Sequence, residues 1–360
     1  MNMFSGAYRD RRVLLTGHTG FKGSWLALWL SRLGASFTGI SLPPETKPNH
    51  WELLNLPMDS RYIDICDARA VQKAFVEIKP EVVFHLGAQA LVRKSYDDPL
   101  ATWETNVLGT ANILEACRNT PSVKAIIVVT TDKCYENREW IWGYRENDSL
   151  GGHDPYSASK AAAELVVQSY RRSFFLQADS PFLATARAGN VIGGGDWAAD
   201  RLIPDLIRSV HASKTLEIRS PNATRPWQHV LESLSGYLLL GQALINGKRE
   251  FSDAWNFGPD ITGNRSVSWV LNYMKTEWGA LNWEVEESAQ LHEATLLYLD
   301  STKARQKLGW TPVWTIETGL SKTAQWYRRF MEGNSVISDQ QLDEYLRDAT
   351  DKELIWATSK

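Results

Sequence analysis

Three glycines near the start of the chain constrain the fold more than any other feature of the sequence. They stand at Gly17, Gly20 and Gly23, directly after the short apolar run 12–16 and at the start of a segment with an apolar helical stripe. A strand, glycine turn and helix in this order let the backbone turn tightly, approach a diphosphate closely and direct a helix N-terminus at its charge. We therefore predict that this turn binds phosphate groups; a purely structural turn is the weaker alternative.

Segments with strand character alternate with segments of helical character after this turn. The expected strands are 12–16, 36–41, 82–86, 125–130 and 182–186, and the expected helices are 24–33, 71–78, 102–118 and 158–174. Such alternation predicts an α/β protein with a Rossmann-type, doubly wound parallel sheet.

The pattern loosens after residue 186 into loops rich in proline, glycine and tryptophan, with shorter helices expected between them. We interpret 1–186 as a cofactor-binding domain. We expect 187–335 to be mainly a smaller, mixed domain that binds the substrate, with some segments returning to the first domain. The polar tail, 336–360, is either a terminal helix or an arm for a partner.

Composition excludes several classes of protein. The chain has 360 residues and a net charge of −3, so it can bury a sizeable core and lacks the basic excess of a nucleic-acid-binding protein. Three scattered cysteines, Cys66, Cys117 and Cys134, suit neither a disulfide framework nor a metal site. The apolar runs are no longer than strands, and the polar start lacks a signal peptide core, so we expect a cytoplasmic protein that binds no membrane.

A tyrosine and a lysine four residues apart mark the candidate catalytic site. Tyr156 and Lys160 would share one helix face, where the ammonium can stabilise a phenolate and make it a usable base near neutral pH. Such a spacing is common and usually structural when it stands alone. Here the glycine turn and the polar strand end 130–133 precede it, which favours catalysis.

Other strand ends extend the predicted cofactor site. Asp64 and Ile65 follow a short strand and could hold an adenine, with a surface turn as the alternative. The residues 86–89 are small enough for a cofactor to pass close by, unless they begin a helix. An acidic residue is missing near the end of the second strand, where it would bind ribose hydroxyls, but no arginine stands there to receive a 2′-phosphate either. We therefore favour NAD over NADP.

Together these motifs resemble the extended short-chain dehydrogenases/reductases that act on nucleotide sugars. Supporting segments lie at 187–193, 202–204, 225–230, 255–258 and 308–312. The resemblance implies NAD as the cofactor and a homodimer or homotetramer in which helices 102–118 and 158–174 of two chains pack together. The cofactor-binding residues that it implies are Gly17, His18, Thr19, Gly20, Phe21, Lys22, Gly23, Asp64, Ile65, Leu86, Gly87, Ala88, Gln89, Asn106, Thr130, Tyr156 and Lys160. The substrate-binding residues that it implies are Arg187, Asn190, Arg225, Asn256 and His292.

The dipeptide Asp132-Lys133 distinguishes branches of that family. Epimerases generally carry serine, threonine or alanine in place of Asp132, whereas 4,6-dehydratases carry an acidic residue that is usually followed by glutamate. Aspartate followed by lysine, together with the segments 142–146 and 150–156, resembles the dehydratase branch whose substrate is CDP-glucose.

This resemblance implies a lyase reaction by internal hydride transfer. Hydride leaves sugar C4 for the nicotinamide, water is lost across C5 and C6, and the hydride returns at C6. Tyr156 would take the C4 hydroxyl proton, Thr131 would hydrogen-bond that oxygen, and Lys160 would hold the tyrosine proton-poor. Asp132 would protonate the departing C6 hydroxyl, and Lys133 would take the C5 proton. The product would feed deoxysugar synthesis for lipopolysaccharide.

Two alternatives stay open at this point. The chain could be a dehydratase or C4 epimerase for another nucleotide sugar. More remotely, it could be a dinucleotide sensor without catalytic activity.

Overall fold

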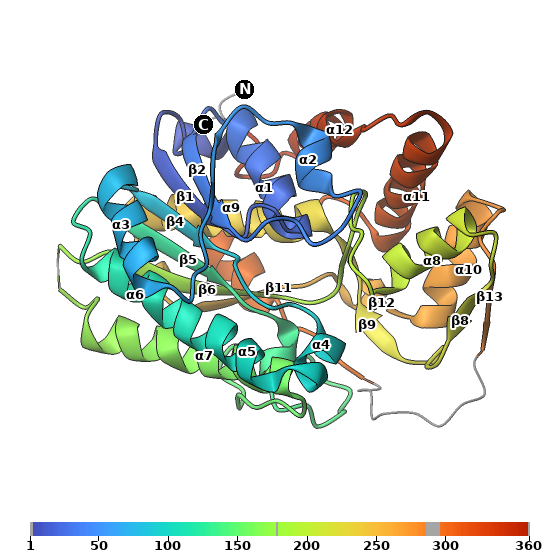
Figure 1. Ribbon diagram of the computed structural model, residues 1–360, viewed down its shortest axis with the longest axis horizontal. Coiled ribbons are helices and arrows are strands. Elements are labelled where there is room, and N and C mark those ends of the chain that lie inside the picture. Colours follow the sequence, from blue (N-terminus) through green and yellow to red (C-terminus); the bar gives the residue numbers. More distant parts are fainter. Residues whose placement is uncertain (1–2, 178, 286–295, 359–360) are drawn as a thin grey trace.

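A seven-stranded parallel sheet forms the centre of the protein (Figure 1). The computed structural model describes residues 3–177, 179–285 and 296–358. The strands lie in the order β11-β6-β5-β4-β1-β2-β3, and each pairs in parallel with its neighbours. Their bounds are β1 (Arg12–Thr16), β2 (Ser36–Ser41), β3 (Asp59–Tyr62), β4 (Val82–His85), β5 (Ala125–Val129), β6 (Phe182–Ala188) and β11 (Ala254–Phe257). The predicted Rossmann-type sheet is confirmed.

Helices cover both faces of this sheet, which is why β4 and β5 are buried along their whole length. Side chains alternate between the faces, so that Val13 and Leu15 join one apolar core while Leu14 joins the other. The first core is covered by α1 (Phe21–Arg32), α9 (Val230–Ile245) and α12 (Ser338–Asp351), and the second by α3 (Ala68–Ile78), α6 (Gly109–Arg118) and α7 (Pro155–Ser173).

The strand order reverses between β1 and β4, because the chain builds outward from β1 to β3 and then from β4 to β6 on the other side. In open parallel sheets, ligands bind outside the carboxyl ends of the strands at such a reversal. We therefore expect a ligand to bind at the carboxyl ends of β1, β4 and β5.

A smaller part of the chain packs beside the carboxyl ends of the strands (right side of Figure 1) around a core of its own. Its helices are α8 (Leu202–His211), α10 (Val267–Glu277) and α11 (Ile316–Gly333). Its two-stranded ladders are β7 (Val191–Ile192) with β10 (Gln228–His229), β8 (Leu216–Ile218) with β13 (Trp283–Val285), and β9 (Thr224–Pro226) with β12 (Asn264–Ser266).

Two sequence-based expectations about helices need correction. The segment 102–118 is not one α-helix: α5 (Pro99–Trp103) and α6 flank a π-helical turn, η2 (Glu104–Leu108). The helices after residue 186 are not all short, because α9 has 16 residues and α11 has 18. The remaining short elements are α2 (His50–Leu54), α4 (Val92–Asp97), η1 (Met3–Gly6), η3 (Asp132–Cys134), η4 (Arg249–Phe251), η5 (Ile261–Gly263) and η6 (Ala304–Leu308).

The polar tail folds back onto the beginning of the chain. Tyr345 of α12 packs edge-on against Trp29 of α1, with ring centroids 5.6 Å apart. Farther along, the Trp356 ring stacks on Phe4, and the Trp356 carbonyl accepts a 2.7 Å hydrogen bond from the Phe4 N–H. Of the two readings of the tail, the structure therefore has the terminal helix.

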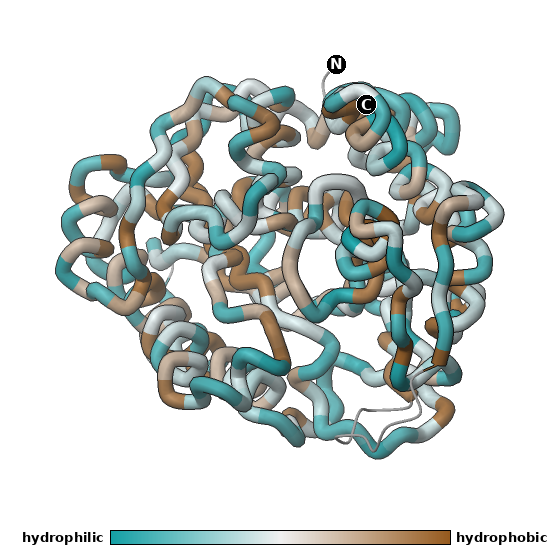
Figure 2. Tube along the Cα trace, turned by 45° about the vertical axis from the view of Figure 1, so that its right-hand side comes forward, coloured by the Kyte–Doolittle hydropathy of each residue, from teal (hydrophilic) through white to brown (hydrophobic). Residues whose placement is uncertain are grey.

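Hydropathy varies along the helices over short distances, and Figure 2 shows hydrophilic and hydrophobic residues interleaved in them. Within the ranges that the structure describes, no helix combines the length and the apolar character needed to cross a membrane.

Candidate active site

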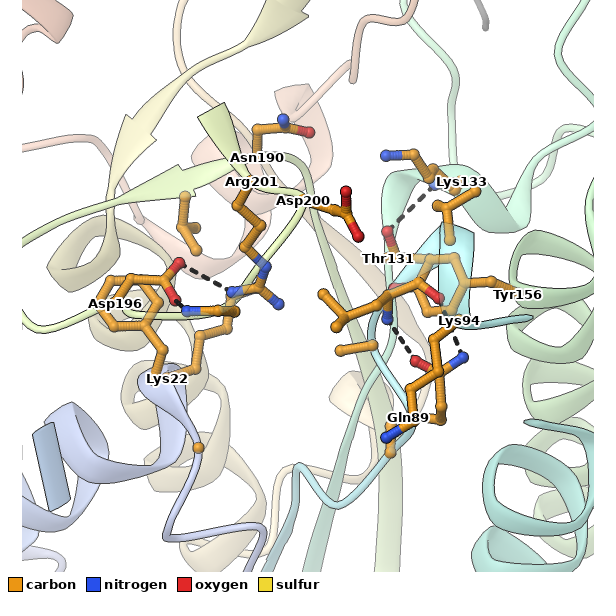
Figure 3. A pocket seen from close by; sticks show the side chains of 18 of the residues that line it. Lys22, Gln89, Lys94, Thr131, Lys133, Tyr156, Asn190, Asp196, Asp200 and Arg201 are labelled. Atoms are coloured by element: carbon orange, nitrogen blue, oxygen red, sulfur yellow. Dashed lines mark hydrogen bonds and ion pairs between the residues drawn. The ribbon is translucent and has the colours of Figure 1, made fainter. Parts of the chain in front are cut away.

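A cavity of about 2140 Å³ opens at the carboxyl ends of β1, β4 and β5 and extends into the smaller part of the chain. Figure 3 shows side chains facing it from opposite sides: Lys22, Asp196 and Arg201 on one, Thr131, Lys133 and Tyr156 on the other. Most of the predicted site residues therefore lie around one space, although they come from distant parts of the sequence.

The glycine turn forms one wall of this cavity. Gly17 has a φ of +74°, and a Cβ there would lie 2.8 Å from the Gly87 nitrogen. A Cβ on Gly23 would lie 2.0 Å from the Gly17 carbonyl oxygen. Helix α1 begins at Phe21, so Gly23 lies in its first turn, and its N-cap, Gly20, has no side chain to occupy the first N–H groups. The turn thus fits the close approach of a diphosphate to backbone and helix N-terminus.

His18 stands apart from the rest of this turn because it does not line the cavity. Its buried ring lies against Gly39 of β2 and edge-on to Trp51, and its Nε2 is 2.7 Å from the Ser60 hydroxyl. Burial lowers the pKa of His18 to about 4, so the ring is neutral.

Further cofactor-site predictions also lie along the cavity, which is lined by Asp64, Ile65 and the segment 86–89. Asn106 is buried behind this segment and clamps Gln89: it accepts from the Gln89 N–H at 2.9 Å and donates to the Gln89 carbonyl at 3.0 Å. Asn106 therefore supports the wall and does not form it.

Tyr156 lies in the first turn of α7. That turn is fixed by Asp154, whose carboxylate accepts a 2.9 Å hydrogen bond from the Ser157 N–H. Burial raises the pKa of Tyr156 to about 12, although a hydrogen bond with Thr131 acts in the opposite direction. The phenol is therefore protonated at neutral pH in the protein alone.

Lys160 follows one turn later and donates a 3.1 Å hydrogen bond from Nζ to the Val129 carbonyl at the end of β5. Burial lowers the pKa of Lys160 to about 8, and the carboxylate of Glu164 opposes that shift. The helix thus presents a phenol and a readily titrating amine to the same cavity.

Asp132 and Lys133 leave the end of β5 in the short turn η3. Asp132 is 1% exposed, and its Oδ1 accepts a 2.9 Å hydrogen bond from the Thr131 hydroxyl. Among the described residues, no donor reaches its second oxygen, Oδ2. Lys133 is half-buried at the cavity wall, and its N–H donates to the Thr131 hydroxyl at 3.3 Å.

Lys22 has a different environment from its glycine neighbours. Its Nζ donates to the Tyr237 hydroxyl at 3.3 Å. Burial, followed by the positive charge of Arg201, lowers the pKa of Lys22 to about 7, while the negative charge of Asp132 acts to raise it. The sequence signal for this environment is the position of Lys22, an ionisable side chain between the glycines of the turn.

Sequence reasoning missed the neighbouring ion pair. Arg201 lines the cavity and is joined to Asp196 at 2.9 Å. Both residues lie in an irregular loop, where no periodicity indicates which side chains face inward.

The predicted substrate-binding residues divide into two groups. Asn190 and Arg225 line the cavity. Arg187 and Asn256 do not, and we correct their assignment. The Arg187 guanidinium is 3% exposed and bound to Glu164, Tyr135 and the backbone, and the Asn256 amide is likewise buried and hydrogen-bonded within the protein. His292 lies outside the described residues.

No three His, Cys, Asp or Glu side chains in the described parts of the chain gather in a way that could hold a metal ion.

Comparison with known proteins identifies the family. The family described as GDP-mannose 4,6 dehydratase matches residues 14–323. The chain belongs to this family. A CDP-glucose 4,6-dehydratase from Salmonella typhimurium is 45% identical over 352 residues, which cover 95% of this chain and 98% of the relative. A dTDP-glucose 4,6-dehydratase from Shigella flexneri is 27% identical and covers 88% of this chain and 92% of its own.

Solved structures show the same fold. A dTDP-glucose 4,6-dehydratase from Bacillus anthracis in complex with NAD superposes with a TM-score of 0.74 at 21% identity, covering 90% of this chain and 98% of its own. A UDP-glucose 4-epimerase from Stenotrophomonas maltophila with bound NAD gives a TM-score of 0.79 at 19% identity, covering 90% of this chain and 99% of its own. A dehydratase and an epimerase thus share the fold of this chain, so the fold alone does not determine the reaction.

Proposed function

We propose that this protein is an NAD-dependent CDP-glucose 4,6-dehydratase, a lyase that forms CDP-4-keto-6-deoxyglucose and water. One observation carries the proposal: Asp132 and Lys133 face the same cavity as Tyr156, Lys160 and the glycine turn. An epimerase needs no acid and base beyond the pair that oxidises C4, whereas a dehydratase must also protonate a leaving group and remove a C5 proton. The 45% identity to the Salmonella CDP-glucose enzyme supports the choice of substrate.

The chain's own residues fit the cofactor. The glycine turn would hold the diphosphate, Asp64 and Ile65 the adenine, and the segment 86–89 the path toward the nicotinamide. Bound NAD supplies the group that accepts and returns the hydride.

Tyr156 takes the proton of the C4 hydroxyl in the proposed first step. Its pKa of about 12 must fall before it can act as a base near neutral pH. Thr131 hydrogen-bonds to its hydroxyl, and the ammonium of Lys160 provides positive charge one helical turn away. Both groups favour the phenolate.

Asp132 and Lys133 carry out the elimination. Asp132 donates a proton to the departing C6 hydroxyl; its Oδ2 is the atom that the described protein residues leave available. Lys133 takes the C5 proton, which is acidic beside the new ketone. The two residues are adjacent in η3, so one short turn holds both groups at the cavity wall.

The test is incubation of the purified protein with NAD and CDP-glucose, with dTDP-, GDP- and UDP-glucose in parallel. We expect the alkali-induced absorbance of a 4-keto-6-deoxy sugar with CDP-glucose alone and no net NADH. Activity with another nucleotide would keep the chemistry and overturn the substrate. No product with any sugar nucleotide would return the C4 epimerase and the non-catalytic sensor to consideration.

The role of Lys133 has its own test. In deuterated water, Lys133→Met should lose incorporation of deuterium at C5 while oxidation at C4 still occurs, as followed by the transient absorbance of NADH. Exchange at C5 at the wild-type rate would assign the base to another residue.

We further infer that the protein is a cytoplasmic homodimer or homotetramer and that its product serves lipopolysaccharide synthesis. Within each chain, we propose that 1–186 binds NAD and that 187–335 mainly binds the sugar nucleotide. Exposed apolar side chains on the segments expected at the interface support the assembly: Trp103 is 39% exposed, Leu108 59% and Leu165 54%. Sedimentation of the wild type and of Leu165→Glu tests it; a monomeric wild type would overturn the inference.

A further inference from the structure

The carboxylate of Glu164 lies one helical turn beyond Lys160 on α7, and neither the predicted cofactor site nor the predicted substrate site includes it. Glu164 is 4% exposed and does not line the cavity. Tyr156, Lys160 and Glu164 follow one another at intervals of four, so all three lie along one side of the helix. A buried carboxylate requires compensation by charge and hydrogen bonds, and the structure provides both.

Four donors surround this carboxylate. Oε1 accepts from the Thr130 hydroxyl at 2.5 Å and from Arg187 Nε at 2.9 Å. Oε2 accepts from the Thr185 hydroxyl at 2.9 Å and from Arg187 Nη2 at 2.8 Å. The arginine is therefore bidentate, and the pair joins α7 to β5 and β6 from behind the active site.

The contact with Thr130 places Glu164 next to the reacting groups. Thr130 immediately precedes Thr131 and Asp132, so the Glu164 carboxylate fixes the point at which β5 turns into the catalytic loop. Arg187 extends the network by donating to the Tyr135 hydroxyl at 2.7 Å, just beyond η3. The loop that carries Thr131, Asp132 and Lys133 is thus tied to this pair before and after η3.

We propose that Glu164, held by Arg187, is a positioning residue that keeps Lys160 in its ammonium form and fixes the end of β5. This deepens the proposed function, because the ammonium of Lys160 is what favours the Tyr156 phenolate there. Lys160 is buried, and its pKa is already lowered to about 8 by that burial. The negative charge of Glu164 is the largest effect acting in the other direction.

Other ionisable groups also surround Lys160. Cys134 in η3, His85 at the end of β4 and Lys22 at the start of α1 interact with it electrostatically, and Tyr156 lies on the same helix. Asp132 and Arg187 act on the Cys134 thiol beside it. Burial lowers the pKa of His85 to about 3 and raises that of the Cys134 thiol, so both are neutral near pH 7. Lys22 disfavours a further positive charge. Among the groups that act on Lys160, Glu164 is therefore the carboxylate that favours its ammonium form.

The test measures Lys160 directly in the cofactor-free protein. Acetylation by acetic anhydride requires the neutral amine, so the rate of labelling at Lys160, followed by mass spectrometry against pH, reports its protonation. Two charges about 6 Å apart in a medium of dielectric about 20 shift a pKa by about 2 units. We expect Glu164→Gln to lower the labelling midpoint of Lys160 by about 1 to 2 pH units, because Arg187 then keeps its charge without a partner.

Thr185→Val is the matched control. It removes one hydrogen bond from the same carboxylate and changes no charge, so it should lower thermal stability and leave the Lys160 midpoint within about half a pH unit of wild type. Equal midpoints in Glu164→Gln, Thr185→Val and wild type would overturn the proposal. Labelling uses neither substrate nor NAD, so failure here is separate from failure of the proposed dehydratase activity.

Two further variants test the effect of the Glu164 charge on Lys160 if Glu164→Gln does not fold. Glu164→Asp retains the charge and should keep the wild-type midpoint despite reduced stability. Glu164→Gln/Arg187→Met removes both charges and avoids an unpaired arginine, so its midpoint should lie at least half a pH unit below that of Glu164→Asp. Identical midpoints in these two variants would show that the pair has only a structural role.

Discussion

Two regions around the catalytic cavity differ in how their charges are compensated. Behind α7, each oxygen of Glu164 has two donors, and Arg187 pairs with it in a fixed bidentate geometry. At η3 and at the start of α1, one oxygen of Asp132 has no donor among the described residues, and Lys22 is held by a 3.3 Å hydrogen bond to a phenol.

This difference distinguishes residues that hold the site in place from residues that take part in the reaction. Saturated polar networks hold neighbouring groups in one geometry, whereas buried groups with spare hydrogen-bonding capacity cost stability and are available to a ligand. We therefore expect substitutions behind α7 to reduce stability, and substitutions at Lys22 or Asp132 to increase it.

The largest effect should come from replacing Tyr156, the group on which both regions act. Tyr156→Phe removes the proposed base, so kcat with CDP-glucose should fall by about 10³ to 10⁴ while the fold remains intact. Steady-state kinetics and circular dichroism check this. Tyr170→Phe makes the same change farther along α7, away from the cavity, and should leave kcat within about twofold; equal losses in the two variants would remove Tyr156 from the chemistry.

Arg187→Met should give the largest loss of stability. It leaves the Glu164 carboxylate buried without its cation, which typically costs about 3 to 5 kcal/mol in the free energy of unfolding. Urea denaturation provides the measurement. Arg61→Met, which breaks more exposed ion pairs with Asp59 and Glu77, should cost less than about 1 kcal/mol. Similar losses in both variants would contradict the contrast.

Asp132→Asn should change activity and stability in opposite directions. Asp132 is a buried carboxyl with one oxygen that lacks a donor, so its replacement should raise the melting temperature by a few degrees, while dehydration slows by about 10² to 10³ because the C6 hydroxyl loses its acid. Oxidation at C4 does not require this acid, so NADH absorbance should build up after CDP-glucose is added. A variant that forms product at the wild-type rate without such a build-up would refute the assignment.

Lys22→Met should have the smallest effect, a change in stability, and the pH dependence of this change tests the role of the Lys22 charge. The pKa of Lys22 is about 7 in the folded protein and about 10.5 when unfolded, so the charged form costs stability below pH 7 and the cost disappears as the pH rises toward 10.5. The variant should be more stable than wild type by about 1 to 3 kcal/mol at pH 6 without NAD, and by much less at pH 10. An advantage that does not change with pH would mean that packing, not charge, is responsible.

The sequence was most informative where local rules decide the structure. The bounds of β1 and β2 match the prediction because turn residues delimit both strands, and β1 also has a clear apolar run. The spacing of Tyr156 and Lys160 predicted that they share one helix face, although α7 begins at Pro155, earlier than the expected start at residue 158; Asp154 and Pro155 are the local signals for that start.

It was least informative where a distant partner decides. Arg187 and Glu164 are 23 residues apart, so nothing local indicates that the guanidinium is neutralised inside the protein and does not bind substrate. Helix α9 is buried on almost every side, and without a polar stripe its sequence gives little helical periodicity. The π-helical turn between α5 and α6 likewise has no recognised sequence signal here.

The packing of α12 on α1 has a consequence for synthesis on the ribosome. Helix α1, which begins at the phosphate-binding turn, is synthesised long before Tyr345 and Trp356, which cover it. The cofactor turn therefore lacks its complete support until α12 and Trp356 have been synthesised. A nascent chain that stalls near residue 335 would expose Trp29 to chaperones and proteases.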